Sequence, residues 1–165
     1  MLRLTKDDTH PVRFTLNGRP VSVRVAPRTL LTDTLRHAIG ATGTHVGCEH
    51  GVCGACTVQV NGEPVRACLM LAQQAQGCDI RTVEALAEGP DLSPLQAAFR
   101  EHFALQCGFC TPGFVVACTA VLTKNPDATL EEAQAGCGGN LCRCGTYVGM
   151  NQALMDAAKS LKGGA

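Results

Sequence analysis

The sequence predicts an α+β fold built from two small units, a sheet-containing unit over residues 1–86 and a helical unit over residues 87–165. Three observations predict it. Apolar residues alternate with polar ones in the first half, whereas in the second half they recur at helical spacing behind capping motifs. A chain breaker, Gly89-Pro90, stands between the two halves among polar residues, so we expect the domain boundary there.

The first half begins with a predicted β-hairpin and a helix. Alternating apolar residues in segments 12–16 and 21–25 flank Asn17-Gly18, and this pattern is typical of a hairpin with a tight turn. Apolar residues then recur on one face of segment 31–39, which predicts a helix. Gly40 follows as its expected stop, because glycine adopts the left-handed backbone that ends helices.

A second hairpin is predicted after a loop rich in glycine and cysteine over residues 43–56. Segments 57–60 and 64–66 are short stretches in which apolar residues alternate with polar ones or follow one another, and Asn61-Gly62 lies between them. Two hairpins and one helix together predict a small α+β unit in the first half of the chain.

Four helices are predicted in the second half. Ser93-Pro94-Leu95-Gln96 is a capping box with proline at the first helical position, and Thr129 to Glu132 is a second capping box. Thr111-Pro112 begins another helix, and segment 147–161 carries apolar residues at helical spacing. Four short helices with apolar faces favour a bundle.

The charge balance limits the partners. The chain has 165 residues with 14 Lys+Arg and 14 Asp+Glu, so its formal net charge is zero. Nucleic acids and anionic membranes require excess positive charge, and we expect neither as a partner. The longest apolar stretch, residues 114–122, is too short for direct membrane insertion. Residues 1–10 show no signal peptide, so a cytoplasmic location is expected.

Eleven cysteines carry the chemistry of this sequence. An odd number without an export signal is atypical of a disulfide framework, and in a reducing cytosol such cysteines bind metal more often. Eight of them fall into two groups: the first group is Cys48, Cys53, Cys56 and Cys68, and the second group is Cys107, Cys110, Cys142 and Cys144.

The first group has the C-x4-C-x2-C…C spacing of plant-type [2Fe–2S] ferredoxins. Gly47, Gly51 and Gly54 punctuate its loop, and glycine lets backbone N–H groups approach cluster sulfur closely. A zinc loop or reactive thiols are the alternatives. Structural zinc usually takes two tight pairs of ligands, whereas here one loop supplies three, so the spacing favours a [2Fe–2S] cluster.

Both pairs of the second group lie near predicted helix N-termini, where the helix dipole and unpaired N–H groups stabilise thiolates and sulfides. A Cys-x-x-Cys pair alone is weak support, since redox pairs and zinc sites share it. Cys-x-Cys is less usual for structural zinc. The spacing favours a second iron–sulfur cluster and leaves the zinc and redox interpretations open.

Three sequence motifs around the cysteines are more informative than the cysteine spacing alone. GCEHGVCGAC at 47–56, QCGFCTPGF at 106–114 and GNLCRCGTY at 139–147 resemble the iron–sulfur subunit of molybdenum hydroxylases, the family of xanthine oxidase, aldehyde oxidoreductase and aerobic carbon monoxide dehydrogenase. The resemblance covers residues 12–161 in the motif order of the family. It is specific because two unrelated cysteine patterns occur together in one chain.

The resemblance implies a plant-ferredoxin-like β-grasp domain followed by a four-helix bundle, each with one [2Fe–2S] cluster held by the cysteines of its group. It also implies a hetero-oligomer. A large subunit would hold molybdopterin, usually as the cytosine dinucleotide in bacteria, and a medium subunit would commonly hold FAD. Electrons would pass from molybdenum through the second-group cluster and then the first to FAD or another acceptor. Gln106 and Cys144 would contact the pterin.

Some residues depart from the family pattern. Many members have Thr-Gly-Tyr after the last ligand, whereas this chain has Gly145-Thr146-Tyr147. Cys78, Cys118 and Cys137 match no family ligand, and we expect Cys118 to be a core residue and Cys78 an incidental thiol. Cys137 lies close to Cys142 in sequence and could in principle compete as a ligand, but we do not expect it to, because cluster loops hold fixed geometry. Among the aromatic residues, Phe109 and Tyr147 are expected to pack beside the helical core.

Two other functions stay open. One is a free two-cluster ferredoxin, which predicts a monomer with a polar surface, and the other is a zinc or thiol redox-sensor protein. The sequence shows no nucleotide-binding loop, no nucleophile–base pattern and no paired carboxylates. We therefore expect a chain that is inactive alone and conducts electrons for a catalytic partner.

Overall fold

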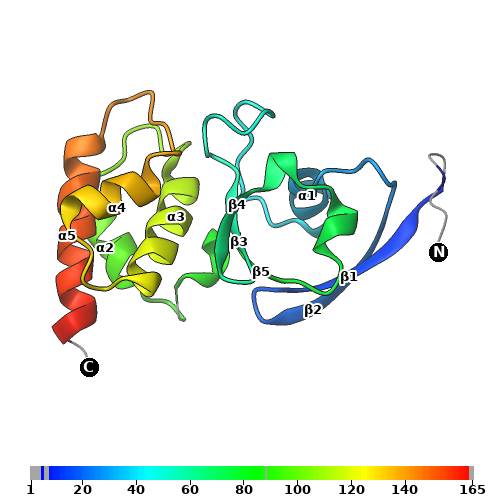
Figure 1. Cartoon of the computed structure of the whole chain (residues 1–165), viewed down its shortest axis with the longest axis horizontal. Helices are drawn as coiled ribbons and strands as arrows, with labels where there is room; N and C mark the ends of the chain where they lie inside the picture. The colour runs from blue at the N-terminus through cyan, green and yellow to red at the C-terminus, as the bar shows by residue number, and fades with distance from the viewer. Residues whose placement is uncertain (1–4, 6–7, 88, 164–165) are drawn as a thin grey trace.

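A five-stranded sheet and four longer helices occupy opposite ends of the molecule (Figure 1). The structure is a computed structural model that describes residues 5, 8–87 and 89–163. The strands are β1 (His10–Leu16), β2 (Arg19–Val25), β3 (Thr57–Val60), β4 (Glu63–Arg66) and β5 (Asp79–Arg81). The helices are α1 (Leu31–Asp33), α2 (Pro94–Glu101), α3 (Thr111–Lys124), α4 (Leu130–Cys137) and α5 (Tyr147–Gly163).

The sheet has the strand order β2-β1-β5-β3-β4. β1 and β2 form the first expected hairpin, and β3 and β4 form the second, both antiparallel. At the second turn, Asn61 and Gly62 have φ of 52° and 84°, the left-handed backbone that an Asn-Gly hairpin turn requires. β5 was not expected. It lies parallel to β1 and antiparallel to β3, and so joins the two hairpins into one sheet.

The predicted helix over 31–39 is present, but it is not a uniform α-helix. It begins as α1 and continues as a π-helix over Thr34–Ile39. The Thr34 hydroxyl donates to the Leu30 carbonyl at this junction, a type of back-bonding that bends helices. Gly40 ends the helix with φ of 86°, as expected. The helix buries Leu31 and Leu35 completely in the core of the sheet half.

Four helices in the second half begin where the sequence predicts them. In the two capping boxes, the side chains of Ser93 and Thr129 accept from the backbone N–H of Gln96 and Glu132. α2 packs mainly on α5, while α3 packs on α4. Their shared core is separate from that of the sheet half. None of the helices in the described ranges is long and apolar enough to cross a membrane.

α3 connects the two halves. Its buried residues run almost all the way round the helix, which is the pattern of a helix covered on every side. One side contacts the helical core, and the other packs against β3, whose four residues are all buried. The amide of Gln59 on β3 donates to the carbonyl of Val116 at 3.4 Å across this contact. The loops that carry cysteines therefore lie close to a packed junction.

Candidate functional site

The first cysteine group lies on the loop between the π-helix and β3, with its last member in a 3₁₀ turn after β4. Its members come together in two pairs. The backbone N–H of Cys53 donates to the Sγ of Cys48 at 3.5 Å, and the thiols of Cys56 and Cys68 contact each other. The first pair is half-buried and the second is buried.

Cys48 and Cys56, one thiol from each pair, differ in how easily they ionise. Hydrogen bonds from the backbone N–H groups of Cys53 and His50 lower the pKa of Cys48 to about 6. Burial, together with the neighbouring Cys68, raises the pKa of Cys56 to about 11. A metal ion overcomes such a raised pKa, because a coordinating thiol is deprotonated outright. The Cys56 thiol therefore suits a cation at close range, and hydrogen bonds already stabilise the Cys48 thiolate.

Glycines allow the loop to approach its neighbours, as the sequence indicated. Gly51 and Gly54 have φ of 80° and 75°. A Cβ on Gly51 would lie 2.4 Å from the Leu69 side chain, and one on Gly54 would lie 2.7 Å from the carbonyl oxygen of Gly139. A side chain at Gly54 would have to displace backbone, and one at Gly51 would have to displace the Leu69 side chain.

The second cysteine group is divided between the loops that precede α3 and α5. Cys110 is the N-cap residue of α3, and its thiol lies within hydrogen-bond distance of Cys142. Burial, followed by the contact with Cys142, raises the pKa of Cys110 to about 12. At Cys142 burial opposes ionisation, but hydrogen bonds from the Thr146 hydroxyl and backbone outweigh it and lower the pKa to about 7. Cys107 is exposed and Cys144 is half-buried.

A pocket of 460 Å³ lies where the two groups meet. It is lined by Cys53 of the first group and by Cys107, Cys110 and Cys142 of the second. The backbone N–H of Leu141 donates to the Cys53 carbonyl at 2.9 Å, so a hydrogen bond joins the two loops directly. The two groups, far apart in sequence, thus form neighbouring sites.

Side chains that the sequence analysis did not single out hold this arrangement. Asn140 is 3% exposed, and its amide donates to the Gly54 carbonyl at 2.9 Å and to the Thr57 hydroxyl at 3.2 Å. Arg66 on β4 donates to the Gly139 carbonyl at 2.6 Å and to the same Thr57 hydroxyl at 2.7 Å. We call Thr57, Arg66, Gly139 and Asn140 the clasp. It ties the sheet half to the loop that carries Cys142.

The expectation that Phe109 and Tyr147 pack beside the helical core is wrong for Phe109, which is 47% exposed and is not part of that core. Tyr147 is 42% exposed, but its ring does meet the core residue Phe114 edge-on, with ring centroids 6.2 Å apart. Phe109 stacks on His45 with ring centroids 5.0 Å apart, and its carbonyl lies 2.7 Å from the His45 Nδ1. The Tyr147 hydroxyl accepts from the backbone N–H of Cys142 at 2.8 Å. Both aromatics line the 460 Å³ pocket, so they belong to the site.

The remaining cysteines lie elsewhere. Cys118 is completely buried in the helical core, as expected. Cys137 is in the same core, with its sulfur against that of Cys118. Cys78 is half-buried at the edge of the sheet core. Gln106, the expected pterin contact, is exposed and adjoins Cys107.

The donor set fits a two-iron centre better than a single metal ion. Within residues 8–87 and 89–163, no three or more His, Cys, Asp or Glu side chains gather in a way that suits one ion. Thiols instead meet two at a time, and a [2Fe–2S] cluster divides four thiolates between two irons. The Cys48–Cys53 and Cys56–Cys68 pairs match that division, as does the Cys110–Cys142 contact.

Comparison with known proteins identifies two family domains that together span most of the chain. Residues 14–87 match the family described as "2Fe-2S iron-sulfur cluster binding domain". Residues 82–155 match the "[2Fe-2S] binding domain" family.

Curated relatives and solved structures agree with these matches. The chain is 50% identical to caffeine dehydrogenase subunit gamma of Pseudomonas sp. strain CBB1, over 93% of this chain and 91% of that one. It is 52% identical to the nicotine 6-hydroxylase small subunit of Paenarthrobacter nicotinovorans, over 86% of each. Quinoline 2-oxidoreductase from Pseudomonas putida 86 matches with a TM-score of 0.91 and 44% identity, over 96% of this chain and 99% of that one.

A longer protein contains the same fold as one part. Aldehyde oxidoreductase from Desulfovibrio gigas matches with a TM-score of 0.89 and 38% identity, over 94% of this chain but 18% of that one. Both halves of the chain match iron–sulfur domain families, and relatives near 50% identity match it over most of its length. The chain belongs to the iron–sulfur small subunits of the molybdenum hydroxylase family, the electron-transfer components of multisubunit oxidoreductases.

Proposed function

We propose that the chain holds two [2Fe–2S] clusters, one in each cysteine group. The ligands of the first are Cys48, Cys53, Cys56 and Cys68, and those of the second are Cys107, Cys110, Cys142 and Cys144. The two-by-two meeting of thiols is the observation that carries this assignment. We also propose a ferredoxin-like β-grasp domain over residues 1–86 and a four-helix bundle over residues 87–165, with α2 to α5 as its helices.

When bound, such clusters supply one-electron carriers whose potentials depend on hydrogen bonds to sulfur and on solvent exposure. The residues of this chain set both properties. Backbone N–H groups of Cys53 and His50 point at the Cys48 sulfur, and the Thr146 hydroxyl lies 3.3 Å from the Cys142 sulfur. The hydrogen bond between Leu141 and Cys53 keeps the two sites adjacent, which electron transfer between them requires.

We propose the electron direction that the family resemblance implies, and exposed residues at each end offer a surface for the partner it requires. Gln106 and Cys107 are exposed beside the second group, where a large subunit with the molybdopterin cytosine dinucleotide would dock against Gln106 and Cys144. Val52 and Leu69, each next to a first-group cysteine in sequence, are 57% and 62% exposed. FAD on a medium subunit, or another acceptor, would receive electrons at that end.

These exposed apolar side chains favour a subunit over a free ferredoxin, for which a polar surface was expected. Large apolar residues are exposed next to cysteines of both groups, and such surfaces mark protein contacts. Coexpression with the products of neighbouring genes should yield a stable complex that contains molybdenum. A chain that stays monomeric in the presence of those partners supports the free ferredoxin instead.

Metal analysis tests the cluster assignment. Two [2Fe–2S] clusters require about four irons and four labile sulfides per chain. Cys53→Ser should remove one of the two EPR signals of the reduced protein and leave the other, because Cys53 belongs to the first group. Cys78→Ser is the matched control and should leave both signals. Stoichiometric zinc without sulfide would overturn the assignment.

The relatives also favour a substrate class for the complex. Those named for caffeine, nicotine and quinoline, all nitrogen heterocycles, are 44–52% identical to this chain, against 38–41% for the aldehyde oxidoreductases. We propose a nitrogen heterocycle as the substrate. Reduction of the clusters in the complex by a panel of heterocycles, with aldehydes in parallel, tests this assignment. Reduction by aldehydes alone would contradict it.

A further inference from the structure

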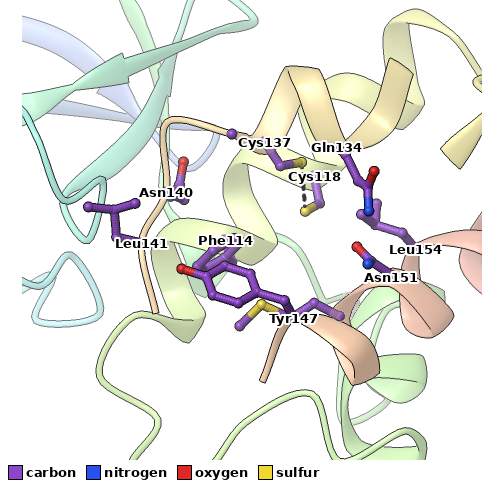
Figure 2. Close-up of a pocket in the computed structure, with 11 residues that line it drawn as sticks. Phe114, Cys118, Gln134, Cys137, Asn140, Leu141, Tyr147, Asn151 and Leu154 are labelled. Atoms are coloured by element: carbon purple, nitrogen blue, oxygen red, sulfur yellow. Dashed lines mark hydrogen bonds between the residues drawn. The ribbon is translucent and has the colours of Figure 1, made fainter. Parts of the chain in front are cut away.

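Two buried cysteines outside both groups face each other between α3 and α4. The Sγ atoms of Cys118 and Cys137 lie 2.9 Å apart, and the side chains belong to residues that are 0% and 5% exposed. Figure 2 shows the two sulfur atoms facing one another, with the Gln134 and Asn151 side chains nearby. A disulfide bond is about 2.05 Å long, so the two sulfur atoms need to come closer by about 0.9 Å to form one.

We propose that Cys118 and Cys137 form an oxidation site, at which hydrogen peroxide converts the two thiols to a disulfide that joins α3 to α4. The Cys137 thiolate attacks one peroxide oxygen, the O–O bond breaks, and a sulfenic acid forms while hydroxide leaves and is protonated to water. The Cys118 thiol then attacks the sulfenic sulfur, an S–S bond forms, and the S–O bond breaks to release a second water. Two thiols and one peroxide thus give one disulfide and two waters.

The close approach of the helices is built into the sequence. A Cβ on Gly136 would lie 2.5 Å from a methyl group of Val121, which is too close for any side chain at that position. Gly136 directly precedes Cys137, and Val121 lies about one turn beyond Cys118 on α3. Because Gly136 has no side chain, α3 and α4 can approach each other closely beside the Cys118–Cys137 pair.

A pocket gives a small oxidant a way to the pair. It has a volume of 310 Å³ and includes both cysteines in its lining, together with the polar side chains of Gln134, Asn140 and Asn151. Hydrogen peroxide is close to water in size and fits such a space, and amide groups can hydrogen-bond to it. The pair is thus buried from bulk solvent but lies at the wall of a pocket whose mostly apolar lining includes three amide side chains.

The pair is also asymmetric in a way that suits the order of the two steps. The hydrogen bond from Cys118 lowers the pKa of Cys137. That same contact, followed by burial, raises the pKa of Cys118 well above its ordinary value. Because the thiolate is the nucleophile, Cys137 is the attacking residue and Cys118 the resolving one.

The position of the disulfide gives it a consequence for the site. α4 ends at Cys137, and the next residues form the loop with Gly139 and Asn140 of the clasp, followed by Cys142. A covalent bond at Cys137 would fix the start of that loop to α3, whose N-cap is Cys110. The disulfide would therefore hold two second-group cysteines in place under oxidising conditions.

The experiment uses the cluster-loaded chain, purified with any subunits that accompany it. Hydrogen peroxide is added in increasing amounts while the visible absorbance of the clusters is followed, and thiols are alkylated after rapid acid denaturation. The chain has 11 cysteines, and we expect it to lose two alkylatable thiols before cluster absorbance falls. Peptide mass analysis should locate a linked pair, lighter by two hydrogens, at Cys118 and Cys137, and a dithiol reductant should restore both thiols.

Four variants make the test specific. Cys78→Ser should form the same disulfide, whereas Cys118→Ser and Cys137→Ser should each form none. Gly136→Ala should slow its formation, because the added methyl group separates α4 from α3. Cys118 and Cys137 that remain alkylatable throughout, or that appear only as separate sulfinic acids, would overturn the proposal. Iron and sulfide contents measured before oxidation keep that outcome separate from any failure of the cluster assignment.

Discussion

At the scale of single residues, Arg66 connects the two halves through one side chain. Its guanidinium donates to the Thr57 hydroxyl on β3 and to the Gly139 carbonyl beyond α4. Gly139 has no Cβ, and one there would lie 2.3 Å from the Arg66 guanidinium. The arginine and the glycine are therefore a matched pair, and neither is replaceable without loss of the contact.

Arg66→Gln should lower stability, because a shorter side chain loses both hydrogen bonds and leaves the Gly139 carbonyl unpaired. Hydrogen bonds from charged groups contribute about 1.5–3 kcal/mol, and at this chain length each kcal/mol corresponds to about 2–4 °C in Tm. Thermal scans of the cluster-loaded protein measure this loss as a fall in Tm. Arg81→Gln is the control, since Arg81 is exposed and its guanidinium lies 3.9 Å from Asp79. Equal shifts in both variants would contradict the role of Arg66.

Asp156 on α5 gives the helical half a dependence on pH. Its carboxylate lies 2.6 Å from the His102 ring at the end of α2 and 3.2 Å from the Lys159 ammonium. These hydrogen bonds lower the pKa of Asp156 below its ordinary value of 3.8. Because the pKa is lowered in the folded state, the stabilisation is present above pH 3.8 and is lost as pH falls through the lowered value.

Asp156→Asn should therefore lower Tm at neutral pH, and the difference from the unmodified chain should shrink as pH falls below 3.8. Parallel thermal scans over a pH series provide the measurement, with both proteins in the cluster-free form because acid destroys [2Fe–2S] clusters. A difference that is constant across the series would show that the carboxylate charge has no part in the contact.

At the scale of elements, α3 is the helix on which the two sites depend, and its first turn packs directly against the first-group loop. A Cβ on Gly113 would lie 2.3 Å from the Gly54 carbonyl oxygen and 3.0 Å from that of Ala55. These are backbone atoms of the first-group loop, so they cannot rotate away as a side chain can. The N-terminus of α3, with Cys110 as its cap, is thereby held against the first cysteine loop.

Gly113→Ala should consequently destabilise the protein and weaken the contact between the sites. Overpacking costs about 1–3 kcal/mol, which exceeds the gain of under about 1 kcal/mol from alanine in a first turn. Thermal scans and the spin interaction between the reduced clusters measure the two effects. Thr123→Ala, at an exposed position of the same helix, should change neither. An unchanged Tm in Gly113→Ala would show that the first-group loop moves to accept the methyl group without loss of stability.

The sequence predicted most elements, and those it missed share a cause. Asn-Gly turns and capping boxes are local signals, and the hairpins and helices that carry them are where they were expected. β5 is three residues long and buries only Ile80, so no alternation can be seen in it. The π-helical part of segment 31–39 has no signal in apolar spacing, which is similar for both helix types over so few residues.

At the scale of the whole molecule, cysteine spacing grouped the candidate ligands but left their neighbours unknown. Motif spacing is read along the chain, whereas the clasp joins residues from β3, β4 and the loop after α4. Arg66 and Asn140 have ordinary surroundings in sequence, and only the fold brings them together. Phe109 was misplaced for the same reason, because its partner His45 is distant in the chain.

Asn140 offers the sharpest test of whether the halves behave as one body. Its amide is buried and donates to the Gly54 carbonyl and the Thr57 hydroxyl, and that hydroxyl already donates to the Gly54 carbonyl at 2.6 Å. Asn140→Asp replaces the donor by an oxygen that faces other oxygens, and Arg66 can pair with the new charge only by leaving the Thr57 hydroxyl or the Gly139 carbonyl. The clasp should open while both cores stay intact.

Calorimetry of the cluster-loaded protein should therefore show one cooperative transition for the unmodified chain and two for Asn140→Asp, since two cores joined only by weakened contacts unfold separately. Asn125→Asp is the matched control, because its side-chain oxygen accepts from a backbone N–H, and an aspartate preserves that bond. Two transitions in the unmodified chain, or one unshifted transition in Asn140→Asp, would mean that the clasp does not couple the halves. Coupling by the clasp would instead make each cysteine group depend on the fold of the other half.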